Sequence, residues 1–340
     1  MKTALTCVLL LLSFGSSAGC ERKPEEPSAH TAASSSAPSG AAKKGREEEP
    51  RDGAEIAEPQ GAFRLPGAAR IVAIGDLHGD FSATERAFRL AGAIDAGGKW
   101  LGGKLVVVQT GDQLDRGDGE KEIIEFLERL SIEAKEAGGA LVVLNGNHET
   151  MNVLGDFRYV TEGALRAFDK FEPAAPLSIQ VEGPYKSRAA AFLPGGGAAL
   201  ILAKRPLVAM VGDTVFAHGG VRPEHVEYGI DKLNAESRNW MEGKTTLPPR
   251  LVLEEEGPLW TRIYGNADVS PAACEILSKT LKRLGAARMA VGHTVQEGGM
   301  SSACGGRVFR IDVGLAAHYG GRKAQVLEIQ GGAARILTED

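Results

Sequence analysis

Three short runs of apolar, largely β-branched residues recur at regular intervals and restrict the folds open to this chain. The runs are Ile71–Ile74, Leu105–Val108 and Leu141–Leu144, about 35 residues apart, and each ends at a glycine-bearing turn. Short continuous apolar runs are typical of strands buried on both faces. Because each interval has the size of a βαβ unit, the sequence predicts a parallel core with right-handed helical crossovers.

The intervals between these runs carry helical patterns. Apolar side chains at positions 123, 126, 127, 130 and 134 follow three- and four-residue steps, and Gly138–Gly139 ends the pattern. Residues 81–94 show a weaker version of the same spacing. Acidic residues are favoured at the start of a helix by its dipole, so we expect Asp118 and Glu120 to cap the helix that follows them.

Further strands are expected in the second half of the chain. Residues 207–211 and 214–217 flank Gly212–Asp213, which is a strong signal for a two-residue hairpin. The segments 289–291, 308–311 and 324–329 also have strand character. We interpret residues 155–205 and the polar helical stretch near residues 224–242 as insertions or caps, and assign no elements within 155–205.

The amino-acid composition is that of a globular protein. The chain has 340 residues, of which 43% are apolar and 24% charged, and its formal net charge is -5. The charges are spread along the chain without a basic stripe, which argues against a nucleic-acid partner.

The N-terminal residues resemble an export signal. Lys2 precedes an apolar run and a small-residue stretch that ends at Cys20. This run is too short for a spanning helix, and residues 1–20 are expected to be a signal peptide. The stretch Ser17–Cys20 resembles a bacterial lipobox, which implies lipidation of Cys20, with ordinary cleavage as the alternative.

The next segment, residues 21–62, is built from Glu, Lys, Pro, Ser, Ala and Gly, and we expect a disordered linker. A folded domain is then expected to span residues 63–340. The expected location is a bacterial cell envelope, with the lipid anchor holding the domain at a membrane, facing the periplasm or the exterior. Glu21 mildly favours an outer membrane by analogy with lipoprotein sorting. In an oxidising compartment Cys274 and Cys304 could pair or remain free thiols, and the sequence leaves both open.

Polar side chains gather directly after the predicted strands. The blocks are Gly75–Asp80, Gly111–Gly117, Gly146–Glu149, His218–Gly220 and Gly292–Thr294. Ligand sites in such sheets lie beyond the carboxyl ends of the strands. The blocks offer six oxygen and nitrogen donors and no thiol: Asp76, His78, Asp112, Asn147, His218 and His293. This set suits two divalent cations that share one carboxylate, with manganese favoured and iron, zinc or magnesium as alternatives.

The ordered motifs GDLHGD, GDQLDRG, GNHE, HGG and GHT resemble those of the calcineurin-like metallophosphoesterases. Within them they are similar to the phosphoprotein phosphatases, and to the bacterial Shewanella-like branch in particular. The resemblance covers about residues 68–315. It implies a β-sandwich with flanking helices, in four layers α/β/β/α.

The resemblance also implies a role for each motif residue. Asp76 and His78 would hold one cation, Asp112 would bridge, and Asn147, His218 and His293 would hold the other. Arg116 would bind the phosphoryl oxygens. Asp115 would orient His148, which would act as general acid, and the nucleophile would be a hydroxide bridging the cations. The activity implied is dimetal-dependent hydrolysis of phosphate monoesters by a phosphatase acting on phosphorylated proteins or small phosphoesters.

Some positions depart from the eukaryotic phosphoprotein phosphatases. Gln113–Leu114 stands where those enzymes have Tyr-Val, and Ile311–Gly314 lies near the place of their missing C-terminal tyrosine block. Arg262 resembles a second phosphate-binding arginine, but it could equally form a surface ion pair.

Two other functions are compatible with the motifs. One is hydrolysis of dinucleoside polyphosphates or nucleotides, and the presence of Asp115 argues for the monoesterase instead. The other is a non-catalytic envelope lipoprotein that uses the fold as a binding platform.

Overall fold

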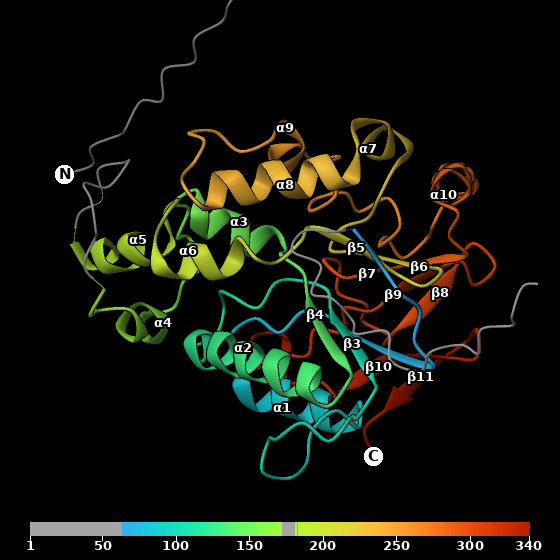
Figure 1. Cartoon of the computed structure of the whole chain (residues 1–340), viewed down its shortest axis with the longest axis horizontal. Helices are drawn as coiled ribbons and strands as arrows, with labels where there is room; N and C mark the ends of the chain where they lie inside the picture. Colours follow the sequence, from blue (N-terminus) through green and yellow to red (C-terminus); the bar gives the residue numbers. More distant parts are fainter. Residues whose placement is uncertain (1–62, 172–180, 182) are drawn as a thin grey trace, which may run out of the picture. The chain divides into compact units, whose positions relative to one another are not determined.

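Two β-sheets form the centre of this protein (Figure 1). The computed structural model describes residues 63–171, 181 and 183–340, and the predicted signal peptide, Cys20 and linker lie outside these residues. One sheet has the strand order β11 (Ala333–Thr338), β10 (Gln325–Gln330), β2 (Arg70–Ile74), β3 (Val106–Gln109) and β4 (Ala140–Val143). The other has the order β1 (Arg64–Leu65), β5 (Val208–Val211), β6 (Thr214–Ala217), β7 (Arg288–Val291), β9 (Val308–Arg310) and β8 (Ser301–Ala303).

The five-stranded sheet contains the three predicted strands. β2, β3 and β4 are parallel neighbours, and α1 (Phe81–Leu90) and α2 (Glu120–Glu136) connect them, as the apolar spacing predicts. β3 ends one residue later than expected, at Gln109. The amide of this buried side chain donates hydrogen bonds to the carbonyls of Gly75 and Gly111, so the polar residue is accommodated within the strand.

The six-stranded sheet is mixed. The predicted hairpin is confirmed, because β5 and β6 pair antiparallel around Gly212–Asp213. β7 lies parallel to β6, and β9 lies parallel to β7. The carboxyl ends of β6 and β7 therefore lie at the same edge of this sheet.

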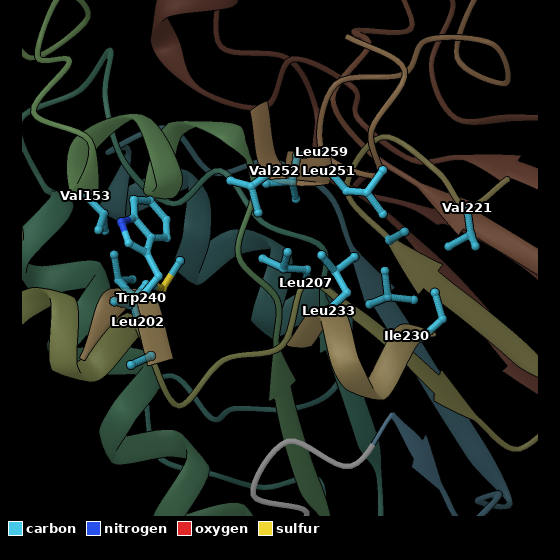
Figure 2. Packing of buried hydrophobic residues seen from close by; sticks show 14 of the residues in the cluster. Val153, Leu202, Leu207, Val221, Ile230, Leu233, Trp240, Leu251, Val252 and Leu259 are labelled. Carbon is cyan, nitrogen blue, oxygen red and sulfur yellow. The ribbon is translucent and has the colours of Figure 1, made fainter. Parts of the chain in front are cut away.

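Alternate residues of the six-stranded sheet face two different cores. Val215 and Ala217 pack with helices, whereas Phe216 packs with the apolar residues of the five-stranded sheet. The covering helices include α5 (Lys186–Phe192) and α6 (Gly197–Leu202), from the segment in which no elements were predicted. They also include α7 (Pro223–Tyr228) and α8 (Ile230–Met241), from the stretch that was predicted to be helical. Figure 2 shows part of this core, with Leu202 and Trp240 among its members. Because α1 and α2 cover the other sheet, the expected α/β/β/α layering is confirmed (Figure 1).

Further elements complete the described part of the chain. They are α3 (Asn147–Val153), α4 (Glu162–Ala167), α9 (Arg250–Leu253), α10 (Pro271–Leu284) and the 3-10 turns η1 (Gly183–Tyr185) and η2 (Ala317–Tyr319). Cys274 of α10 and Cys304, which follows β8, form a disulfide with their Cα atoms 5.3 Å apart. Of the two alternatives left open by the sequence, the structure has the paired one. None of the helices in the described residues has the length and apolar character needed to span a membrane.

The predicted caps of α2 are wrong. Gly119 is the N-cap residue, and the exposed Asp118 instead accepts a hydrogen bond from the hydroxyl of Thr161. Glu120 begins the helix but is fully buried. Its carboxylate accepts hydrogen bonds from Arg188 and from the backbone N–H of Asp115, because these donors lie inside the protein and draw the side chain away from the helix end.

Candidate metal centre and proton donor

The six predicted donor residues converge at the polar ends of the two sheets. Asp76 and His78 follow β2, Asp112 follows β3, and Asn147 begins α3 after β4. His218 follows β6 and His293 follows β7. All six are buried. His78, Asp112 and His293 have φ angles of 44°, 54° and 66°, an uncommon backbone conformation that is often found at functional sites.

One carboxylate oxygen lies at the centre of the cluster. Oδ2 of Asp112 is 3.6 Å from Nε2 of His78 and 3.2 Å from Nε2 of His218. Two groups of residues have donor atoms close enough for a cation, and Asp112 belongs to both: one contains His78 and His148, the other His218 and His293. Asp112 therefore occupies the position expected of a bridge between two cations.

Asp76 and Asn147 complete the two groups. Oδ2 of Asp76 is 4.0 Å from Nε2 of His78, and the backbone N–H of His293 donates to the same carboxylate. Oδ1 of Asn147 is 2.8 Å from Nε2 of His218. Each of the two groups thus offers both oxygen and nitrogen donors.

Backbone carbonyls fix the tautomers of three of the imidazoles. Nδ1 of His78 bonds the carbonyl of Leu114, Nδ1 of His218 bonds that of Thr110, and Nε2 of His293 bonds that of Trp260, each at 3.0 Å. A carbonyl accepts only from a protonated nitrogen, so in each ring the nitrogen that bonds to the carbonyl is the one that carries a hydrogen. This is the usual orientation of a metal-binding histidine.

The electrostatics of the cluster also suit cations. Burial lowers the pKa of His78 to about 3 and that of His293 to about 2, so both rings are neutral. Burial, together with the charges of Asp312 and Asp112, raises the pKa of Asp76. Burial alone would raise the pKa of Asp112, but His218 and His148 lower it. Neutral imidazoles and crowded carboxylates fit divalent cations, whose charge would relieve the repulsion between the acids.

His148 differs from the other three imidazoles. Its Nδ1 lies 2.5 Å from Oδ2 of Asp115 and hydrogen bonds to this carboxylate, while its Nε2 faces Oδ2 of Asp112 at 3.8 Å. Burial lowers the pKa of His148, but the charges of Asp112 and Asp115 outweigh this and raise it. A carboxylate partner stabilises the imidazolium form, which is the form that can donate a proton.

Arg116 is held between two aromatic rings at the mouth of the site. Its guanidinium lies 5.2 Å from the ring centre of Tyr159 and 5.3 Å from that of Tyr319, and Nη1 is 3.1 Å from Nε2 of His78. A pocket of about 350 Å³ opens beside it, lined by residues that include His318. The sequence analysis missed Tyr159 and Tyr319, because neither belongs to a motif.

Arg262 also borders the cluster. Its Nη1 donates to the carbonyl of His293 at 2.9 Å and to the hydroxyl of Thr294 at 3.0 Å. Among the described residues no ion pair of Arg262 is found, and its contacts are with the backbone and a hydroxyl of the turn after β7.

Glu149 organises the loop that carries Asp112. Its two carboxylate oxygens accept hydrogen bonds from the backbone N–H groups of Asp112, Gln113, Leu114 and Gly146, at 2.6–3.1 Å. Glu149 belongs to the GNHE motif, but no role for it was predicted from the sequence. Its position inside that motif was the feature of the sequence that could have indicated a role at the site.

A buried ion pair lies next to Asp115. Arg188 of α5 and Glu120 of α2 both have no exposed surface, and Nη1 of Arg188 is 2.7 Å from Oε2 of Glu120. The sequence analysis missed Arg188, which lies in the unassigned segment 155–205 and has no motif around it.

Comparisons with known proteins agree with this site. Residues 69–297 match the family model "Calcineurin-like phosphoesterase". The chain is 37% identical to Shewanella-like protein phosphatase 2 of Arabidopsis thaliana, covering 80% of this chain and 78% of the relative. It is 27% identical to Shewanella-like protein phosphatase 1 of Plasmodium berghei, over 79% and 75% of the two chains. Among solved structures, the cold-active protein-tyrosine phosphatase of a psychrophilic Shewanella species is similar, with a TM-score of 0.65, 25% identity and coverage of 81% and 82%.

Proposed function

The chain belongs to the calcineurin-like phosphoesterase family and is a phosphatase, and we propose that it hydrolyses phosphate monoesters at the cluster around Asp112. The substrates would be phosphorylated proteins or small phosphoesters. Relatives named as protein phosphatases support the first class, and the similar structure of a protein-tyrosine phosphatase makes phosphotyrosine one candidate.

Two divalent cations would be held at the polar ends of the sheets. Asp76 and His78 would bind one, Asn147, His218 and His293 the other, and Asp112 both. When bound, such ions make water a competent nucleophile near neutral pH and offset charge on the phosphoryl group. Manganese is the first choice, with iron, zinc or magnesium as alternatives, because the donors are oxygen and nitrogen without a thiolate.

His148 would supply the proton that the departing group needs. In the reaction a bond forms between the water oxygen and phosphorus, and the bond between phosphorus and the ester oxygen breaks. The proton on Nε2 of His148 moves to that ester oxygen, which leaves as the alcohol or phenol beside inorganic phosphate. Asp115 stabilises the protonated ring through Nδ1.

Arg116 and Arg262 would orient the phosphoryl group. A guanidinium presents a planar fork of donors that matches phosphate oxygens. Tyr159 and Tyr319 hold the fork of Arg116 toward the cluster, and the neighbouring pocket gives room for the rest of the substrate.

One observation carries this proposal: the different partners of the four imidazoles. Three rings bond to backbone carbonyls, whereas His148 bonds to a carboxylate. The test is a phosphatase assay of the purified protein with added manganese on phosphotyrosine, phosphoserine and phosphothreonine peptides, alongside metal analysis. Hydrolysis of at least one peptide is expected, and a metal-loaded protein without activity on any phosphomonoester would contradict the proposal.

A dinucleoside polyphosphate is the alternative substrate, and the Asp115–His148 pair argues against it. Asp115 is part of the motif that resembles the phosphoprotein phosphatases, and here it is buried and bonded to the ring of His148. The same assay with diadenosine tetraphosphate decides between them, since a higher kcat/KM for the polyphosphate would reverse the choice.

We also place the enzyme at the bacterial cell envelope, anchored through a lipid on Cys20. The signal-like residues 1–20 and the disulfide between Cys274 and Cys304 support an oxidising compartment. Expression of the full chain with Cys20→Ala in a bacterium would release the protein from the membrane fraction and abolish its labelling by palmitate. A Cys20→Ala variant that stays in the membrane fraction and is still labelled by palmitate would exclude Cys20 as the anchor.

A further inference from the structure

Arg188 is a fully buried charge among aromatic rings. Its guanidinium carbon lies 4.6 Å from the ring centre of Phe192, 5.5 Å from that of Phe168 and 5.9 Å from that of Phe157. A charged group in such surroundings requires partners, because burial removes its hydration. The polar partners of Arg188 therefore indicate the role of this residue.

All polar contacts of Arg188 lead toward the Asp115–His148 pair. Nε donates to Oδ1 of Asn152 at 2.9 Å, and Nη1 donates to Oε2 of Glu120 at 2.7 Å. Nη2 has no hydrogen-bond partner and lies 3.7 Å from Oδ1 of Asp115.

Asn152 and Glu120 both hold Asp115 in turn. Nδ2 of Asn152 donates to Oδ1 of Asp115 at 3.1 Å and to the carbonyl of His148 at 2.9 Å. Oε1 of Glu120 accepts from the backbone N–H of Asp115 at 2.5 Å. Asp115 is thus fixed at its backbone, at Oδ1 and, through His148, at Oδ2.

We propose that Arg188 is a positioning residue for the proton donor: with Asn152 and Glu120 it holds the Asp115 carboxylate so that His148 points its Nε2 at the leaving group. This inference rests on the proposed function and identifies a residue, far from every motif, on which the proton transfer depends. Arg188 touches no substrate and acts only through Asp115.

The shape and the charge of arginine both matter in this role. The planar guanidinium reaches Asn152, Glu120 and Asp115 from one fixed plane, which an ammonium on a flexible stem does not reproduce. Its positive charge also compensates two buried carboxylates, Glu120 and Asp115. Replacement by lysine keeps the charge and loses the geometry, so Arg188→Lys separates the two contributions.

The test is the dependence of kcat on the leaving group, measured with aryl phosphates from phenyl phosphate to 2,4-dinitrophenyl phosphate. A poor leaving group needs the proton and a good one does not. In Arg188→Lys, kcat for phenyl phosphate is expected to fall about tenfold or more, whereas kcat for 2,4-dinitrophenyl phosphate changes less than about twofold. KM is expected to stay unchanged, because phosphate binding is not affected.

Further variants separate positioning from folding. Asn152→Ala breaks the link from Arg188 to Asp115 while the Arg188–Glu120 pair remains, and the same selective loss is expected. Combining Arg188→Lys with His148→Asn should add no further loss to that of His148→Asn, since both act on one step. Arg70→Met removes another partly buried ion pair, between Arg70 and Glu328, which lies away from the site. This variant should leave the dependence of kcat on the leaving group unchanged.

The outcomes distinguish this inference from the proposed function. A wild-type protein without phosphatase activity overturns the function itself. If the wild type is active and the folded Arg188→Lys and Asn152→Ala variants lose activity equally on all aryl phosphates, or not at all, the positioning role of Arg188 is wrong.

Discussion

Nδ1 of His148 lies 2.5 Å from Oδ2 of Asp115, and this contact sets His148 apart from the other imidazoles of the site. His148 also lies close enough to His78 and Asp112 to be considered as a cation ligand. The contact with Asp115 instead favours a ring that carries a proton. The two roles predict different results when the ring is removed.

His148→Asn is expected to lower kcat on a phosphate monoester with a poor leaving group by about 100-fold to 10,000-fold, the range typical of a lost general acid. Its metal content should remain that of the wild type. Elemental analysis beside the assay checks both. Loss of one metal ion in this variant would assign His148 to the ligands.

His218→Ala is expected to lose at least one bound ion, because Nε2 of His218 faces both Asp112 and Asn147. Activity should fall with the metal content, which elemental analysis after dialysis measures. His225→Gln is the matched control, since His225 is also buried but bonds the backbone of Arg222 outside the site. A His218→Ala protein with full metal content would contradict the assignment.

Arg116→Lys is expected to weaken phosphate binding while leaving the cations in place. Loss of a charge-assisted hydrogen bond is worth about 1.5–3 kcal/mol, which corresponds to a rise in KM of roughly tenfold to 100-fold. Steady-state kinetics and the inhibition constant of inorganic phosphate measure this effect. An unchanged KM would show that Arg116 does not contact the phosphoryl group.

Glu149→Gln is expected to destabilise the fold as well as the site. Glu149 accepts four backbone N–H groups, and an amide nitrogen in place of one oxygen leaves two of them without an acceptor. The expected loss in the free energy of unfolding is about 2–4 kcal/mol, measured by denaturant titration. The exposed Glu122→Gln on α2 should change it by less than about 0.5 kcal/mol.

Replacing both Cys274 and Cys304 by alanine is expected to lower the stability by about 2–4 kcal/mol, because the disulfide closes a loop of 30 residues in the unfolded chain. The kinetic constants should stay the same, since the bond lies between α10 and the turn after β8. Thermal unfolding with and without reductant provides the measurement. Identical melting of the wild type in both conditions would show that the bond does not stabilise the protein.

Much of the architecture and the donor set could be predicted from local patterns. The runs at 71–74, 105–108 and 141–144 and the hairpin around Gly212–Asp213 gave strands that the structure confirms. The six donor residues converge because each directly follows a strand or begins the next helix, which places them at the carboxyl ends of their strands, and the packing of the two sheets brings these ends together. Asp118 and Glu120 were assigned wrongly as caps, since a local rule for helix starts cannot take account of Thr161 and Arg188, their partners 43 and 68 residues away.

The sequence by itself determined the family, the strand ends and the residues that face the candidate cations, because each motif is a short segment whose chemistry and position can be recognised locally. Only the tertiary structure decided that Cys274 meets Cys304, that Tyr159 and Tyr319 enclose Arg116, and that Arg188 stands behind Asp115. These contacts join residues that are distant along the chain and that no periodicity relates. They form because packing the two sheets and their helices buries polar groups, and each buried group must find a partner within the fold.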